Sequence, residues 1–150
     1  MKIVIASDHG GFQYKKILLP IIAAKGFDIT DLGSFTEAPS DYPDIALLVG
    51  DAIAKGKADR GILICGSGAG VSVAANKCKE IRAAVCHDTY TAHQCVEHDD
   101  VNVLCMGQRV IGIELATEIV LSFLGALFSQ EERHVRRLHK VNAIEVRNMK

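Results

Sequence analysis

The chain has 150 residues, of which 49% are hydrophobic and 23% are charged, and its formal net charge is −1. These values fit one compact domain, here residues 1–150, and they exclude a disordered polyelectrolyte or a nucleic-acid binder with a strong basic excess. Without a secretion signal, an apolar stretch of membrane length or a CxxC pair among its five cysteines, the sequence predicts a cytoplasmic protein with reduced thiols, no membrane association and no structural zinc.

Strand and helix patterns alternate along the chain. Apolar runs rich in β-branched residues predict strands, and periodic apolar segments that end near a glycine predict helices. The expected strands are 2–7, 27–32, 61–65, 81–86 and 101–106, and the expected helices are 12–25, 45–55, 71–76, 89–97, 114–124 and 129–149, with a polar loop at 33–43. Strands that are apolar on both faces and alternate with helices predict a doubly wound, Rossmann-like α/β fold. Its parallel sheet should have about five strands, with helices on both faces.

The last expected helix is long and has two chemically different faces. Its apolar stripe consists of Val135, Leu138, Val141 and Ile144, and its other face is basic. Such a stripe needs a surface to bury against. The helix therefore either packs back on its own sheet or reaches a second subunit, and we favour the second interpretation because two-fold dimers are common.

A glycine-rich turn, Gly66–Gly70, follows Cys65 at the end of the third strand. In an open parallel sheet, ligands bind at the carboxyl ends of the strands. The turn allows close approach, and its amides at a helix start favour an anion such as a phosphate or an enediolate oxygen. The same helix start would favour a thiolate at Cys65 and hence a general base, although Cys65 as a small buried hydrophobe and a purely structural turn remain alternatives. The glycine spacing fits neither a dinucleotide fingerprint nor a hydrolase elbow, but Asp88 after the next strand keeps nucleotide binding open.

Acid–base side chains lie near other strand ends. Asp8 and His9 close the first strand, where they suit proton transfer or hydroxyl binding, unless Asp8 caps the next helix. His98 lies in the polar loop before the fifth strand and could exchange a proton near neutral pH, or simply face solvent. We expect these groups to converge.

Two arginines offer a phosphate clamp. Arg133 and Arg137 are four residues apart, hence on one helix face, and Arg109 follows the fifth strand. Guanidinium groups bind phosphate through paired hydrogen bonds, although a solvated basic face is the alternative. No histidine–carboxylate cluster has the spacing of metal ligands, so we expect no metal.

A series of short motifs runs in order over nearly the whole chain. They are Ser7–Gly11, Asp41–Asp44, Gly61–Gly70, Ala74–Lys77, Ile81–Ala83, Asn102–Leu104, Gly107–Gly112 and Arg133-His134. This ordered set resembles the ribose-5-phosphate isomerase B and galactose-6-phosphate isomerase family, and is most similar to ribose-5-phosphate isomerase B.

The resemblance implies an aldose–ketose isomerase of the pentose phosphate pathway that interconverts ribose 5-phosphate and ribulose 5-phosphate through a cis-enediolate, without a metal or organic cofactor. Cys65 would move the proton between C1 and C2. The other implied roles are enediolate binding by the amides of Gly66, Gly68, Ala69 and Gly70, sugar holding or opening by Ser67, ring opening by Asp8 and His98, phosphate binding by His9, Arg109, Arg133 and Arg137, and a sugar-pocket wall from Tyr42. The family's site lies between subunits, with the His98 and Arg109 positions coming from the partner, which implies a homodimer or tetramer with a shared site.

Two positions depart from the family pattern. Asp99 stands where members usually carry asparagine, and an ionised carboxylate in the site would oppose the enediolate. Glu131-Glu132 replaces Gly-Gly before the Arg-His pair and would weaken a phosphate clamp unless it faces solvent. A hexose-6-phosphate isomerase (allose or galactose 6-phosphate) and a non-catalytic phosphometabolite- or nucleotide-binding module are therefore kept as alternatives.

Overall fold

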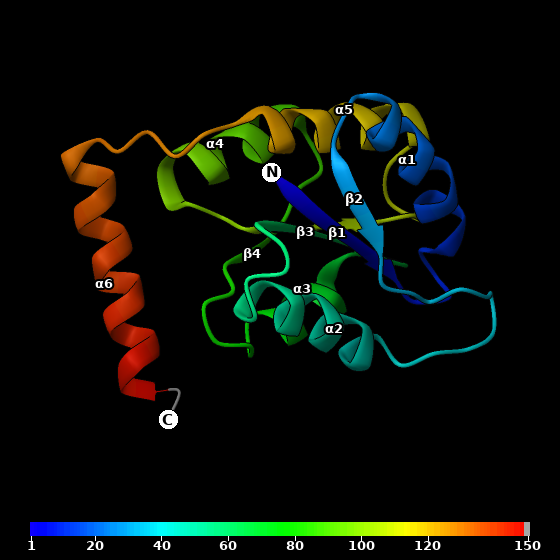
Figure 1. The fold of residues 1–150 in the computed structure, drawn as a ribbon, viewed down its shortest axis with the longest axis horizontal. Helices are drawn as coiled ribbons and strands as arrows, with labels where there is room; N and C mark the ends of the chain where they lie inside the picture. Colours follow the sequence, from blue (N-terminus) through cyan, green and yellow to red (C-terminus); the bar gives the residue numbers. More distant parts are fainter. Residues whose placement is uncertain (149–150) are drawn as a thin grey trace.

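The computed structural model describes residues 1–148 and places a five-stranded parallel sheet between two layers of helices (Figure 1). The strands are β1 (Lys2–Ser7), β2 (Asp28–Asp31), β3 (Arg60–Cys65), β4 (Ala83–Val85) and β5 (Val103–Gly107), in the order β2-β1-β3-β5-β4. The predicted doubly wound α/β fold is confirmed. The middle strand is β3, which ends at Cys65.

Helices cover both faces of the sheet. Those that do so are α1 (Phe12–Ala24), α2 (Tyr42–Ala54), α3 (Ala69–Ala75), α4 (Thr89–Asp99) and α5 (Ile113–Gly125), and α6 (Glu132–Asn148) follows them in the chain. Alternate residues of β3 belong to opposite cores: Ile62 and Ile64 pack with α1, α4 and α5, whereas Leu63 and Cys65 pack with α2 and α3. No helix among the described residues is long and apolar enough to cross a membrane.

Several element ends differ from the sequence prediction. Helix α2 begins at Tyr42 rather than Ile45, because Pro43 fits the first turn of a helix, where its missing N–H is not needed. Strand β4 is only Ala83–Val85, since the residues before it are fixed by side chains: the Asn76 side chain bonds both the amide and the carbonyl of Ala83. Helix α4 continues through Asp99, so His98 and Asp99 lie on a helix and not in a loop.

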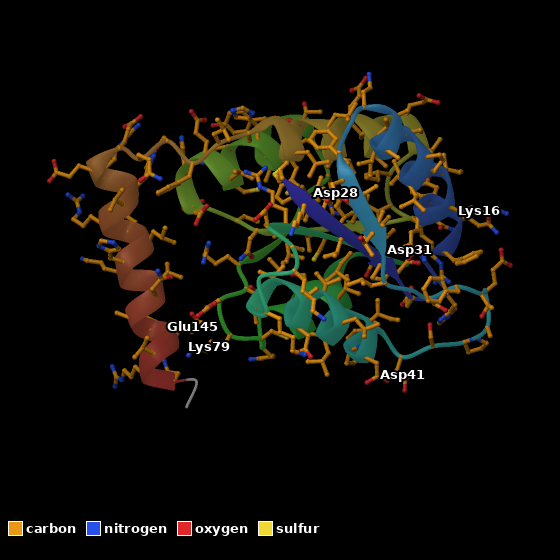
Figure 2. The ribbon with its side chains drawn as sticks, in the orientation of Figure 1. Lys16, Asp28, Asp31, Asp41, Lys79 and Glu145 are labelled. Carbon is orange, nitrogen blue, oxygen red and sulfur yellow. The ribbon has the colours of Figure 1, made fainter. Side chains whose placement is uncertain are left out.

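Helix α6 projects away from the sheet (Figure 1). Its start packs against α4, and among its residues only His134 is buried, while Val141 and Ile144 are 50% and 61% exposed. In Figure 2, Glu145 near the helix end lies beside Lys79, and the Glu80 amide donates a hydrogen bond to Glu145. The interpretation that this helix packs back on its own sheet is therefore wrong. The predicted end at Met149 lies outside the described residues.

The segment between β2 and α2 is held by a buried lysine. The Nζ of Lys15, 2% exposed, donates to both carboxylate oxygens of Asp31, at 2.6 and 2.8 Å, and to the carbonyl of Ser34 at 2.7 Å. Figure 2 shows Asp31 at the end of β2, where this segment begins. Because every ammonium proton has an acceptor, this buried charge is fully paired and serves the structure.

Candidate active site

A cavity of about 360 Å³ opens where β1, β3 and β5 end. Its lining contains seven of the residues predicted from the sequence, together with Val110. The seven are Asp8, Tyr42, Cys65, Gly66, Ser67, Gly70 and Arg109. They form, with His9, what we call the cysteine cluster. It lies at the carboxyl end of the sheet, where an open parallel sheet binds its ligand.

Cys65 is one of the residues that line the cavity. The side chain is 5% exposed and faces the α2 and α3 layer. The backbone amide of Gly68 donates a hydrogen bond to Sγ at 3.0 Å. Gly68 has φ +82°, and a Cβ there would lie 2.9 Å from the carbonyl carbon of Met106, so the turn requires glycine at this position.

The glycine turn uses two of its amides internally. Gly68 donates to Cys65, and Ala69 donates to the hydroxyl of Ser67 at 3.3 Å. In the part of the chain that the structure describes, the amides of Gly66 and Ser67 donate no hydrogen bond. Gly70 lies in the first turn of α3, where helical amides lack a partner within the helix. The amides free to meet a ligand are therefore those of Gly66, Ser67 and Gly70.

Asp8 carries an unsatisfied carboxylate oxygen beside the cavity. The residue is 7% exposed, and its Oδ1 has no hydrogen-bond partner among the described residues. The capping alternative is wrong, because Gly11 is the N-cap of α1 and no side chain caps it. A buried carboxylate oxygen without a donor is costly, and a hydroxyl of a bound ligand would satisfy it.

His9 is held by a partner that the sequence did not indicate. The amide of Ser40 donates to Nδ1 of His9 at 3.3 Å, and the amide of His9 donates to the Ser40 hydroxyl at 3.2 Å. Because Nδ1 accepts, the neutral ring carries its proton on Nε2. The exposed side chain of His9 thus presents an N–H donor next to Asp8.

Arg109 and Tyr42 flank the glycine turn. A Cβ on Gly66 would lie 3.3 Å from Nη1 of Arg109, and one on Gly70 would lie 3.2 Å from the ring of Tyr42. Both side chains belong to the same chain as Cys65. The expectation that Arg109 reaches the site from a partner therefore does not hold for this cavity.

His98 belongs to a second group, on the last turn of α4. Its Nδ1 is 2.9 Å from the side-chain amide nitrogen Nε2 of Gln94. Its ring stacks on that of His134, with centroids 4.1 Å apart and an interplanar angle of 28°. His134 is 1% exposed and its Nδ1 is 2.6 Å from the Ser129 hydroxyl. Burial lowers the pKa of His134, and the nearby His98 and Arg133 side chains lower it further.

The same group includes the basic start of α6. Arg133 and Arg137 are exposed there, and Nε of Arg133 donates to a carboxylate oxygen of Glu131 at 2.8 Å. Asp99 is exposed and lines a groove between α6 and the start of β5. We call the set His98, Asp99, Arg133, His134 and Arg137 the histidine cluster.

The two clusters lie at opposite ends of the parallel strands. Cys65 ends β3, whereas His98 precedes the amino end of β5. One strand of this length separates the two ends by about 16 Å. The expected convergence of His98 with the strand ends is therefore wrong within one chain, because a segment that leads into a parallel strand lies at its amino end. Figure 1 shows α6 beyond that end.

Sequence reasoning missed the residues that hold the predicted ones. Gln94 and Ser129 contact the two histidines, Ser40 contacts His9, and Val110 lines the cavity. The motif Arg133-His134 does not by itself indicate that His134 is buried, although its place one residue after Arg133 signals a different helix face. No group of three or more His, Cys, Asp or Glu side chains among the described residues could hold a metal ion.

Comparisons with known proteins identify the family of this chain. The profile of the Ribose/Galactose Isomerase family matches residues 3–141. Ribose-5-phosphate isomerase B of Escherichia coli is 43% identical over 97% of each chain, and D-erythrulose-4-phosphate isomerase 2 of Mycolicibacterium smegmatis is 38% identical over 97% of each. The solved ribose-5-phosphate isomerase B of Clostridium thermocellum superimposes with a TM-score of 0.95 at 44% identity. The match covers 98% of this chain and 99% of the solved one.

The fold and the residues at its strand ends thus define a sugar-phosphate isomerase. The chain belongs to the ribose/galactose isomerase family. It is an aldose–ketose isomerase, and within the family it resembles ribose-5-phosphate isomerase B.

Proposed function

We propose that this enzyme interconverts ribose 5-phosphate and ribulose 5-phosphate through a cis-enediolate, with the thiolate of Cys65 as the general base. The observation that carries the proposal is Cys65 in the lining of a cavity of about 360 Å³, with its sulfur accepting from the Gly68 amide, next to turn amides that have no other partner. The pentose substrate is supported by the similarity to ribose-5-phosphate isomerase B.

The chemistry needs a base and an oxyanion site together. The thiolate removes the proton from C2 of the open-chain aldose, and the electron pair moves through the new C1–C2 double bond to the carbonyl oxygen O1. The hydroxyl proton on O2 then passes to O1, the C2 carbonyl forms, and the thiol returns its proton to C1 to give the ketose. The amides of Gly66, Ser67 and Gly70 would stabilise the enediolate oxygens, each worth about 2.7–4 kcal/mol in the transition state. The Gly68 amide has a different task from the one first expected, since it donates to the sulfur and stabilises the thiolate.

Ring opening must precede this step, because ribose 5-phosphate is mainly a furanose. Opening moves a proton from the C1 hydroxyl and delivers one to the ring oxygen. The unsatisfied Oδ1 of Asp8 would accept from a sugar hydroxyl, and the N–H of His98 would serve the ring oxygen. Tyr42 would form one wall of the sugar pocket.

The phosphate would be bound by four cationic or N–H-bearing side chains. His9 offers its Nε2 proton, and the arginines offer paired donors. They are Arg109 in the cysteine cluster and Arg133 and Arg137 in the histidine cluster. Asp99 follows His98 on α4 and lines a groove with the later residues of α6, and its replacement by asparagine should raise the rate if the carboxylate faces the enediolate.

A second copy of the chain would bring the two clusters together. Within one chain they lie at opposite ends of the parallel strands, and Val141 and Ile144 of the apolar stripe of α6 are exposed. A two-fold homodimer, alone or within a tetramer, would set the histidine cluster of each copy against the cysteine cluster of the other and cover that stripe.

The base is tested by Cys65→Ala, with Cys78→Ala as the matched control. Cys78 is a partly exposed thiol outside the cavity. In a coupled assay with ribose 5-phosphate, Cys65→Ala should lose about 10²–10⁴-fold in kcat, while Cys78→Ala keeps its activity. Equal turnover in Cys65→Ala and the parent protein would reject Cys65 as the base.

The shared site is tested by mixing two inactive variants. Cys65→Ala disables the cysteine cluster and Arg137→Ala disables the histidine cluster. After co-refolding, half of the dimers are hybrids, and each hybrid has one intact site, so activity should return to about a quarter of the parent value. A mixture that stays as inactive as its components contradicts a site built from two copies.

Substrate preference is tested on a panel of sugar phosphates. We expect kcat/KM for ribose 5-phosphate to exceed the values for erythrose 4-phosphate, allose 6-phosphate and galactose 6-phosphate. A higher value for either hexose would support the hexose-6-phosphate alternative, and a higher value for the tetrose would place the enzyme with its erythrulose-4-phosphate relative.

A further inference from the structure

The ring of His98 is held on two sides. At its edge, Nδ1 lies 2.9 Å from the side-chain amide nitrogen Nε2 of Gln94, one helical turn earlier. An amide nitrogen can only donate, so Nδ1 accepts and the neutral ring carries its proton on Nε2. On its face, the ring stacks on His134, with centroids 4.1 Å apart. Rotation of the His98 ring would break both contacts at once.

His134 is itself fixed in place. It is the buried residue of α6, at 1% exposure, and its Nδ1 lies 2.6 Å from the Ser129 hydroxyl. That hydroxyl accepts from the Glu131 amide at 3.2 Å, and its own proton is then free to be donated to Nδ1 of His134. The Ser129 amide donates to the carbonyl of Glu97 at 3.0 Å. This hydrogen bond connects Ser129, and through it His134, to the turn of α4 that carries His98.

We infer that His134 is a positioning residue for His98: the buried imidazole, fixed by Ser129, holds the His98 ring so that Nδ1 stays on the Gln94 side chain and the proton stays on Nε2, the atom that lies 3.9 Å from the Glu97 carboxylate. The inference rests on the proposed role of His98 in opening the sugar ring. Because His134 is buried behind His98, it acts through His98 and does not contact the sugar. A misplaced proton donor slows only the step that needs it.

Two substrates separate that step from the rest of the reaction. Ribose 5-phosphate closes a furanose through its C4 hydroxyl and must be opened. Erythrose 4-phosphate carries its phosphate on that oxygen and cannot form the ring. Turnover of the tetrose therefore needs the base, the oxyanion site and the phosphate ligands, but no ring opening.

The test measures kcat for both substrates in His134→Ala, Ser129→Ala and His134→Phe. We expect His134→Ala to lower kcat for ribose 5-phosphate by about 10- to 100-fold and to leave the tetrose rate within about twofold. Ser129→Ala should show a smaller loss with the same selectivity. Phenylalanine keeps a flat ring against His98, so His134→Phe should recover most of the ribose 5-phosphate activity. His139→Ala, at an exposed histidine on the same helix, is the matched control.

A second measurement serves if the enzyme converts the tetrose too slowly for its kcat to be compared. Ribulose 5-phosphate cannot close a furanose through its phosphorylated C5 oxygen, so deuterium uptake from solvent at its C1 reports proton transfer alone. His134→Ala should keep this exchange rate. Sedimentation and thermal unfolding of each variant report whether the assembly and α6 remain in place.

The outcomes distinguish this inference from the proposed function. If His98→Asn lowers ribose 5-phosphate turnover selectively but His134→Ala does not, the positioning role is overturned and the proposed function stands. If His98→Asn affects both substrates equally, the ring-opening role of His98 fails and the inference falls with it. An equal loss on both substrates in His134→Ala, with a less stable protein, also overturns it, because His134 would then serve only stability.

Discussion

The backbone amide of Gly68 lies 3.0 Å from the sulfur of Cys65, and it can do so because the chain turns back through a positive φ at that glycine. The turn, the position of the sulfur and the free amides beside it thus depend on one residue without a side chain. A Cβ at this position would meet the backbone of Met106 at 2.9 Å, which cannot move without disturbing β5.

Gly68→Ala should therefore damage both stability and catalysis. The left-handed backbone conformation alone costs about 1–3 kcal/mol in an alanine, and the shifted turn should lower kcat at least tenfold, or about 1.4 kcal/mol. Urea unfolding and steady-state kinetics measure the two effects. Gly125→Ala is the control, because that glycine lies in α5 with nothing within 4 Å of an added Cβ. An unchanged kcat in Gly68→Ala would contradict the importance of the turn geometry.

Ser40→Ala should raise KM for the sugar phosphate while kcat changes little. The hydroxyl of Ser40 accepts from the His9 amide, and its loss loosens a proposed phosphate ligand. A single hydrogen bond of this kind is worth about 0.5–1.5 kcal/mol, so KM should rise about 2- to 10-fold. Thr36→Ala removes a hydroxyl from the same segment, where it accepts only from Ala38, and should leave KM unchanged. A fall in kcat alone would argue against phosphate binding by His9.

Glu131→Gln should tighten substrate binding. The Glu131 carboxylate pairs with Arg133 at 2.8 Å in solvent and competes with a phosphate for the same guanidinium. Exposed pairs are worth about 0–1 kcal/mol, so KM should fall about twofold. Asp51→Asn, which removes the exposed pair with Lys55 on α2, is the control and should not change KM. A raised KM in Glu131→Gln would show that the pair orients Arg133 instead.

The free energy of unfolding should decrease at acidic pH because the folded protein resists protonation of His134. Its pKa is lowered by burial, then by His98 and Arg133, from an ordinary value of 6.5. Below about pH 6.5 the unfolded chain takes up a proton that the folded His134 does not, so the free energy of unfolding decreases as the pH falls. At high pH both states are neutral and the effect disappears.

Urea unfolding between pH 8 and pH 5 measures this slope. His134→Gln removes the titrating ring, so the variant should lose less stability on acidification than the parent protein. His139→Ala, which removes an exposed ring, should retain the parent slope. Parallel curves for His134→Gln and the parent protein would contradict the effect.

The sheet could be predicted because β1, β3 and β5 are short, mostly apolar runs, and residues of β3 face both cores. The cysteine cluster followed from the same reasoning, since Asp8, Cys65 and Arg109 all come after strands and so meet at one edge. Topology alone makes such residues neighbours.

The histidine cluster could not be assigned by that reasoning. His98 comes before a strand, and the helix carrying it runs two residues further than its sequence suggested. The apolar stripe of α6 was visible in the sequence, but periodicity shows only that a helix needs a cover, not what covers it. Ser40 and Ser129 each lie in a loop and contact a histidine of another segment. Nothing in the sequence around these serines indicates the contacts.

The paired ammonium of Lys15 has a consequence for ligand recognition. It secures the start of the span between β2 and α2, and the reciprocal bonds between Ser40 and His9 secure the far end. A span tied down at both ends keeps little freedom to lose. The segment that leads to Tyr42 in the cavity wall is thus ordered by its own contacts, so binding of a ligand there should not cost the free energy of freezing a mobile loop.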